Sequence, residues 1–152
     1  MNVRGSVYHN PRFKFHDGVV GNKLLILLNT PTDDEDYLFV KTTSKQKRRV
    51  KSPGCGKYYA QGEYFIPKGT DCFTEDTWVL LCDLYPISPK DIDNSHDWHL
   101  LKGTVLSVET MQQIIDCLFK HHGEDIPEIY EPWLKPPIES ALSKLAKKFN
   151  RR

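Results

Sequence analysis

The stretch from residue 22 to residue 49 constrains the fold of this chain more than any other. It contains two short apolar runs, residues 24–28 and 37–40, separated by a Pro- and Asp-rich break. Short apolar runs bounded by turn residues are typical of buried strands. The first run is continuous rather than alternating, so we expect a central strand that is buried on both faces. A hydroxyl cluster and a basic tract follow the second run, and phosphate recognition uses this mixture of donors.

Short apolar segments recur along most of the chain. We expect further strands at residues 5–9, 13–15, 58–59, 63–66, 77–84 and 99–105. Many short strands with turns between them, and no helix separating them, indicate an antiparallel sandwich or a small barrel. The segments expected to be loops are residues 43–56, which are basic, and residues 90–98, which are polar.

The hydrophobic periodicity changes at Ser107. Beyond it, apolar residues recur at spacings of three and four, which predicts a helix with Ser107 as its N-cap and Gly123 as its stop. Residues 124–135 are acidic and interrupted by prolines, which predicts a linker. Prolines 136 and 137 open a last helix with a basic face. We therefore expect a mainly β (α+β) domain over residues 1–123, followed by a linker and a basic C-terminal helix over residues 124–152.

Charge is distributed unevenly along the chain. With 152 residues, 39% of them hydrophobic and 27% charged, the chain is expected to form one folded domain. The net charge is only +1, yet residues 41–57 carry basic side chains and no acid. This asymmetry indicates a surface that faces a polyanion, and a solvated loop is the alternative interpretation.

Cysteine spacing and hydropathy bear on compartment and metal binding. The four cysteines lie far apart with no C-x-x-C pair, and the N-terminus has no apolar signal region. We therefore expect reduced thiols in a cytoplasmic protein with no membrane segment. Zinc requires four convergent ligands, and Cys117 with His121 and His122 on one predicted helix falls short. No metal and no cofactor are expected.

Five segments, taken in order, carry a family resemblance. They are residues 5–8 (GSVY), 13–17 (FKFHD), 21–23 (GNK), 37–45 (YLFVKTTSK) and 101–105 (LKGTV) before the amphipathic helix. In order and spacing this set, spanning residues 5–120, resembles the MazF/PemK family of toxin endoribonucleases. The resemblance implies a small SH3-like or PemK-like barrel that dimerises and cuts single-stranded RNA without metal, leaving a 2′,3′-cyclic phosphate. It also implies an antitoxin partner whose acidic segment competes for the basic groove.

The resemblance points to particular catalytic residues. The family's catalytic Thr falls on Thr42, whereas its catalytic Arg position holds Lys23, a departure that replaces a planar bidentate donor with a compact charge. A surface lysine is the alternative interpretation of Lys23. Hydroxyl groups are not bases, so we expect proton transfer from His16 and Asp17, with His9 as a further option.

The basic tract is expected to hold the RNA backbone. The predicted RNA-binding residues are Thr43, Ser44, Lys45, Lys47, Arg48, Arg49 and Lys51. Tyrosines 58, 59 and 64 either stack on bases or belong to the core. Two other functions stay open. One is a barrel that has lost catalysis and binds RNA or a protein, which the Lys23 departure supports, and the other is a structural interaction module.

Overall fold

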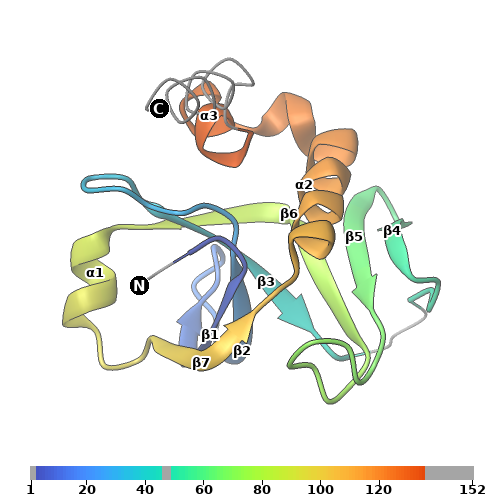
Figure 1. Ribbon diagram of the computed structural model, residues 1–152, viewed down its shortest axis with the longest axis horizontal. Coiled ribbons are helices and arrows are strands. Elements are labelled where there is room, and N and C mark those ends of the chain that lie inside the picture. Colours follow the sequence, from blue (N-terminus) through green and yellow to red (C-terminus); the bar gives the residue numbers. More distant parts are fainter. Residues whose placement is uncertain (1–2, 46–48, 136–152) are drawn as a thin grey trace, which may run out of the picture.

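The computed structural model describes residues 3–45 and 49–135 (Figure 1). Within these residues the fold is mainly β, as predicted, with seven strands in one antiparallel sheet of order β4-β5-β6-β3-β2-β1-β7. The strands are β1 (Ser6–Lys14), β2 (Val20–Leu27), β3 (Tyr37–Thr43), β4 (Gly54–Tyr58), β5 (Gln61–Ile66), β6 (Thr77–Ile87) and β7 (His99–Val105). The helices are α1 (Pro89–Asn94), α2 (Val108–His122) and α3 (Glu131–Leu134), with 3-10 turns η1 (Gly123–Asp125) and η2 (Glu128–Tyr130).

The second half of β2 is buried on both faces because apolar clusters cover both sides of the sheet there. Ile26 belongs to the cluster under α2, whereas Leu25 and Leu27 belong to a second cluster on the opposite face. β2 pairs with β1 on one side and with β3 on the other. The prediction of a central strand from the continuous apolar run is therefore confirmed.

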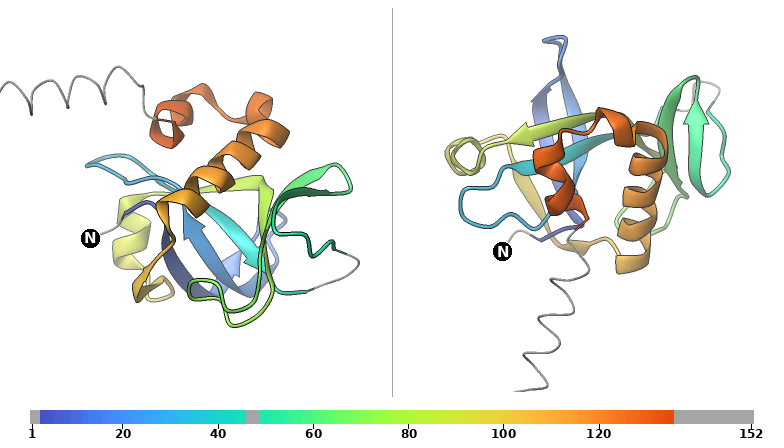
Figure 2. Two further views of the ribbon diagram at one scale, coloured as in Figure 1. Left: turned by 45° about the vertical axis from the view of Figure 1, so that its right-hand side comes forward. Right: turned by 90° about the horizontal axis from the view of Figure 1, so that it is seen from above.

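Helix α2 covers the first cluster. Its buried face includes Ile114, Ile115 and Leu118, and Figure 2 shows the helix beside β4 and β5. The Ser107 hydroxyl accepts a hydrogen bond from the Thr110 amide, and the helix ends at His122, so both predicted helix limits are confirmed. None of the helices in the described residues has the length and apolar character to cross a membrane.

The second cluster is aromatic and is closed by the segment that leads into β7. Phe39 stacks on Trp98 with ring centroids 4.7 Å apart, and Tyr8 meets Phe39 edge-on at 5.2 Å. The polar loop predicted at residues 90–98 contains the short helix α1. Its sequence signal is Ser88, whose hydroxyl accepts from the Asp91 amide at 3.1 Å and caps the first turn.

Gly5, just before β1, forms hydrogen bonds to the end of β2 and to the residue that follows β7. Its amide donates to the Leu27 carbonyl at 2.8 Å, and its carbonyl accepts from the Leu106 amide at 3.0 Å. The backbone has φ +94° here, and a Cβ would approach the Leu106 carbonyl oxygen at 3.1 Å. Only glycine fits both requirements without strain.

Residues 124–135, predicted to be a linker, pack on the domain. Leu134 is fully buried in the cluster under α2, and the Arg4 guanidinium donates to the Leu134 carbonyl at 3.1 Å. Nothing in the sequence indicated this packing, because the apolar residues of this segment recur with neither a helical nor a strand period between its prolines and acidic residues. The predicted C-terminal helix lies outside the described residues.

One pair of cysteines is oxidised. Cys55 on β4 and Cys117 on α2 form a disulfide with Cα atoms 5.5 Å apart, whereas Cys72 and Cys82 are free. The prediction of reduced thiols is wrong for the Cys55–Cys117 pair. The two residues are 62 positions apart, and only the packing of α2 against β4 brings them together.

Candidate functional site

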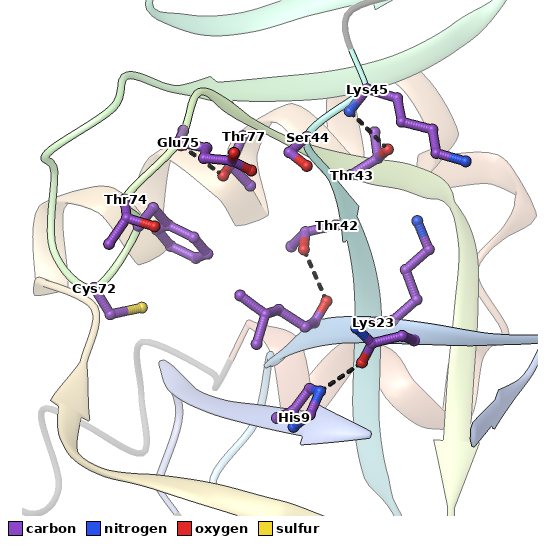
Figure 3. A pocket seen from close by; sticks show the side chains of 13 residues that line it. His9, Lys23, Thr42, Thr43, Ser44, Lys45, Cys72, Thr74, Glu75 and Thr77 are labelled. Carbon is purple, nitrogen blue, oxygen red and sulfur yellow. Dashed lines mark hydrogen bonds between the residues drawn. The ribbon is translucent and has the colours of Figure 1, made fainter. Parts of the chain in front are cut away.

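A pocket of about 260 Å³ lies between the central strands and the loop that connects β5 to β6 (Figure 3). We call it the lysine–threonine pocket. Strands β1, β2 and β3 and the two residues after β3 form one wall, which contains His9, Asn22, Lys23, Leu24, Thr42, Thr43, Ser44 and Lys45. The opposite wall consists of residues 72–75 and 77. Lys23, Thr42, Thr43, Ser44 and Lys45 were all expected to meet phosphate, and the sheet brings them together.

Lys23 carries a half-buried ammonium in a basic environment. Burial lowers the pKa of Lys23 below its ordinary value, and the positive charges of Lys41, Lys45 and Arg49 lower it further. Among the described residues, no acidic side chain forms an ion pair with Lys23 or Lys45. A bound anion would relieve this repulsion, so the pocket is suited to a phosphate group.

Thr42 is buried and its hydroxyl is already engaged. Its Oγ1 donates to the Leu24 carbonyl at 2.8 Å, which ties β3 to β2. The Thr43 hydroxyl oxygen accepts from the Lys45 amide at 3.2 Å, which leaves the hydroxyl hydrogen free to donate. Thr43 and the exposed Ser44 are therefore the better donors to a ligand in the pocket.

His9 is the histidine that lines the pocket. Its Nε2 lies 2.5 Å from Asn22 Oδ1, and because an amide oxygen only accepts, Nε2 carries the proton. The other ring nitrogen, Nδ1, is then an acceptor that can take a proton. Figure 3 shows His9 and Lys23 among the side chains that line the pocket. The sequence pointed to His9 only as a further option, since the pairing of β1 with β2 was not visible in it.

His16 and Asp17 do not line the pocket. The His16 ring stacks on Tyr85 with centroids 4.0 Å apart, and its Nε2 lies 3.2 Å from the Leu84 carbonyl. Asp17 accepts from the Val19 amide at 3.0 Å, within its own turn. Lys23 points into the pocket from β2, although its ammonium lies only 5.9 Å from the ring centre of Phe15, the residue that precedes His16.

Several predicted RNA-binding residues have structural partners instead. Arg49 forms an ion pair with the buried Glu63 at 3.2 Å, and Lys51 pairs with Asp76 at 3.1 Å. Burial raises the pKa of Glu63 and Arg49 lowers it, so Arg49 offsets part of the cost of burying this carboxyl. Lys45, in contrast, has no acidic ion-pair partner among the described residues. Lys47 and Arg48 lie outside the described residues.

The wall formed by the β5–β6 loop has no counterpart in the sequence prediction. It places Cys72, Thr74 and Glu75 opposite the lysines, in a segment with no periodic pattern (Figure 3). Burial raises the pKa of the Cys72 thiol, and the nearby Asp71 carboxylate adds to this rise. The thiol is therefore protonated near neutral pH and is a poor nucleophile.

The wall formed by the β5–β6 loop adds the Glu75 carboxyl group to the pocket. The opposite wall offers two ammonium groups, free hydroxyl donors and an imidazole held by an amide. These groups suit a phosphodiester, since they supply positive charge, hydrogen bonds and a proton acceptor at one place. No protein-family model, no curated protein and no solved structure gives a significant match to this chain.

Proposed function

We propose that this protein is a metal-independent endoribonuclease that holds a phosphate of single-stranded RNA in the lysine–threonine pocket. The observation that carries the proposal is that Lys23 and Lys45, both without an acidic ion-pair partner among the described residues, line the same pocket as His9, Thr43 and Ser44. Cleavage of RNA without metal needs a base for the 2′-OH, stabilisation of phosphoryl charge, and a proton for the leaving oxygen.

Each of these needs has a candidate residue. His9 Nδ1 takes the proton of the 2′-OH while Asn22 holds the ring through Nε2. The 2′-oxygen bonds to phosphorus, and the bond from phosphorus to the 5′-oxygen breaks. Lys23 stabilises the phosphoryl oxygens, and its lowered pKa makes it a better donor of the proton that the 5′-oxygen requires. The products are a 2′,3′-cyclic phosphate and a free 5′-hydroxyl.

We assign the chain to a MazF/PemK-like toxin with an SH3-like barrel. Three features support this assignment: the antiparallel sheet, the helix that directly follows β7, and the lysine–threonine pocket, which is lined by the middle of β2 and the end of β3. A homodimer and an antitoxin with an acidic segment belong to the same proposal. Such a segment would occupy the pocket by offering carboxylates to Lys23 and Lys45.

A second candidate function is RNA binding without cleavage. The observation that favours it is the hydrogen bond from Thr42 to the Leu24 carbonyl, which leaves this hydroxyl with no hydrogen to donate to a phosphate. Lys23 in place of an arginine also offers fewer oriented donors. In this case the pocket would retain RNA through charge alone, with strong salt dependence.

End-labelled single-stranded RNA, incubated with the purified chain in excess chelator, separates the two functions. We expect cleavage that persists with chelator and leaves cyclic phosphate ends. His9→Asn should slow cleavage on the order of 10²- to 10⁴-fold while RNA binding is kept, and Lys23→Ala should weaken both. Salt-sensitive retention without any cutting would favour the binding function.

His16→Asn and Lys51→Ala are the matched controls, because neither residue lines the pocket. Both variants should cut RNA as the wild type does. If His16→Asn abolishes cleavage and His9→Asn does not, the general base belongs to the β1–β2 turn and the role given to His9 is wrong. Cleavage that stops when chelator is added would contradict the metal-independent mechanism.

A further inference from the structure

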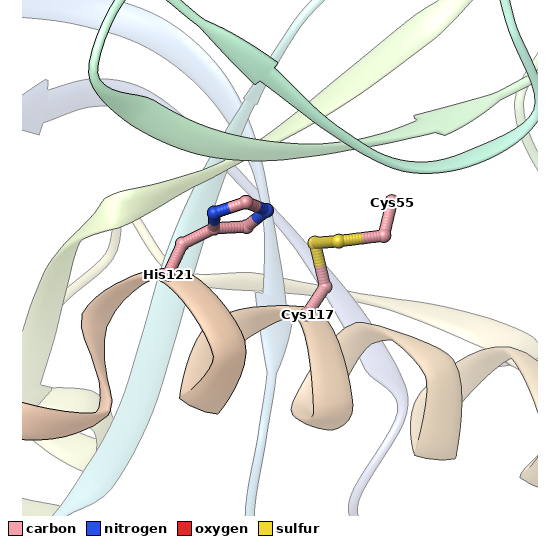
Figure 4. Close-up of side chains that lie close together, drawn as sticks. All are labelled: Cys55, Cys117 and His121. Atoms are coloured by element: carbon pink, nitrogen blue, oxygen red, sulfur yellow. A yellow bond between two sulfur atoms is a disulfide. The ribbon is translucent and has the colours of Figure 1, made fainter.

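A cluster of cysteine and histidine side chains lies away from the lysine–threonine pocket, between α2 and β4 (Figure 4). It consists of Cys55, Cys117 and His121, whose candidate ligand atoms all lie within 4.8 Å of one another. Cys117 and His121 are one helical turn apart, so both project from the same face of α2. Cys55 reaches them from β4, across the interface with the helix.

The His121 ring is held in place but lacks a hydrogen-bond partner. Its Nε2 is buried, and no atom of the described residues accepts from it or donates to it. Figure 4 shows a ring nitrogen on the side of the disulfide. A buried polar atom without a partner costs about 1–3 kcal/mol, so this nitrogen requires an explanation.

The ring position is fixed by the backbone of β5. A Cβ at Gly62 would meet His121 at 2.8 Å, so only a glycine leaves room for the imidazole. The next residue, His122, accepts from the Gly62 amide at 2.9 Å and anchors this end of the helix to the strand. The imidazole is therefore preorganised beside the sulfurs rather than free to turn into solvent.

We propose that Cys55, Cys117 and His121 form a site for a thiolate-preferring divalent cation such as zinc when the disulfide is reduced. Two thiolates and one imidazole are a ligand set that zinc accepts, with a fourth position for water. Cys55 is exposed, which gives the cation an entry path.

Metal and disulfide exclude each other at this site. A dithiol or phosphine reductant supplies two electrons that break the S–S bond, and each sulfur takes up one proton. The cation then replaces both thiol protons, which are released to solvent. With metal–sulfur distances near 2.3 Å, the two sulfurs in a tetrahedral site stand about 3.7 Å apart, a separation that bonded sulfurs cannot have. The proposal does not depend on the function of the lysine–threonine pocket.

Cobalt(II) titration of the full chain tests the site, because cobalt takes zinc's tetrahedral ligands and reports them by absorption. The protein is reduced with a phosphine, which is then removed without air. We expect one Co(II) per chain, with a near-ultraviolet band from thiolate coordination and the intense visible bands of a four-coordinate ion. The oxidised protein should show neither set of bands, and the same bands from oxidised protein would overturn the proposal.

Variants identify the ligands. Cys55→Ser changes an exposed side chain and should remove most of the thiolate band. His121→Gln should weaken Co(II) binding by at least about tenfold, because replacing even a residue that only supports a metal ligand lowers metal affinity by that much. Cys82→Ser is the matched control and should bind as the wild type does. Absence of thiolate bands in the reduced protein, bands that follow Cys82, or unchanged affinity in His121→Gln would each overturn the proposal.

Discussion

Replacing Cys55 by serine removes the cross-link between β4 and α2 and leaves the buried Cys117 in place. The change is confined to an exposed side chain, so the native packing is retained. A cross-link stabilises a protein mainly by restricting the unfolded chain, and the effect grows with the length of the loop that it closes. Cys55→Ser therefore tests whether the Cys55–Cys117 bond adds to the free energy of unfolding the amount that the length of its loop predicts.

The magnitude follows from the loop length. The two cysteines are separated by 62 residues, and a closed loop of that size is worth about 4 kcal/mol at 25 °C. For a domain of this size, each kcal/mol shifts the melting temperature by roughly 2–4 °C. We expect Cys55→Ser to lower the free energy of unfolding by about 4 kcal/mol and the melting temperature by roughly 8–16 °C.

Tryptophan fluorescence during urea or thermal unfolding measures the effect. Trp78 is fully buried, and its indole donates to the Val50 carbonyl at 3.0 Å, so its emission reports on the folded sheet. Chelator in all samples keeps metal from stabilising the reduced protein. Reductant should lower the stability of the wild type to that of the variant and leave the variant unchanged.

Cys82→Ser is the control for loss of a thiol that forms no disulfide. It should unfold at the wild-type midpoint in the absence of reductant. Identical midpoints for wild type and Cys55→Ser without reductant would refute the reasoning, because they would mean that the bond is absent or does not restrict the unfolded chain.

Three other changes have defined outcomes. Gly62→Ala should cost about 1–3 kcal/mol of stability in urea unfolding, because its Cβ would meet His121 at 2.8 Å, whereas Gly56→Ala, with open space around it, should cost far less. Lys23→Ala should reduce the slope of log RNA affinity against log salt concentration by about 0.7 in filter binding, as loss of one phosphate contact predicts. Burial raises the pKa of Tyr8 from 10.0 to about 12, so the folded state holds the phenol proton more tightly than the unfolded state does. The free energy of unfolding should therefore fall as pH rises from about 10 to about 12, and Tyr8→Phe should remove that decline.

Elements with a clear local period could be predicted from the sequence. The run at residues 24–28 predicted a strand buried on both faces, and Ser107 with Gly123 predicted the limits of α2. Both signals are local, since they depend on neighbouring side chains and on capping groups. Helix α1 had a local signal too, in the Ser88 cap, but the polar composition of residues 90–98 favoured a loop interpretation.

Features that depend on strand register could not be predicted. His9 and Asn22 meet because β1 pairs with β2, with His9 opposite Leu24, and Cys55 meets Cys117 because α2 packs on β4. No pattern of residue spacing in the sequence indicates either contact. His16 is closer to Lys23 along the chain, but its ring stacks on Tyr85 and it does not line the pocket.

The pairing of β1 with β7 has a consequence for the growing polypeptide. Ser6 at the start of β1 pairs with Val105 at the end of β7, and the helix that covers the core follows only after that point. While the chain emerges from the ribosome, β1 keeps one unpaired edge and the apolar face under α2 stays uncovered. Unpaired edges and exposed apolar surface are the features that chaperones bind and that promote aggregation. We therefore expect this protein to depend on protection until β7 and α2 have been synthesised.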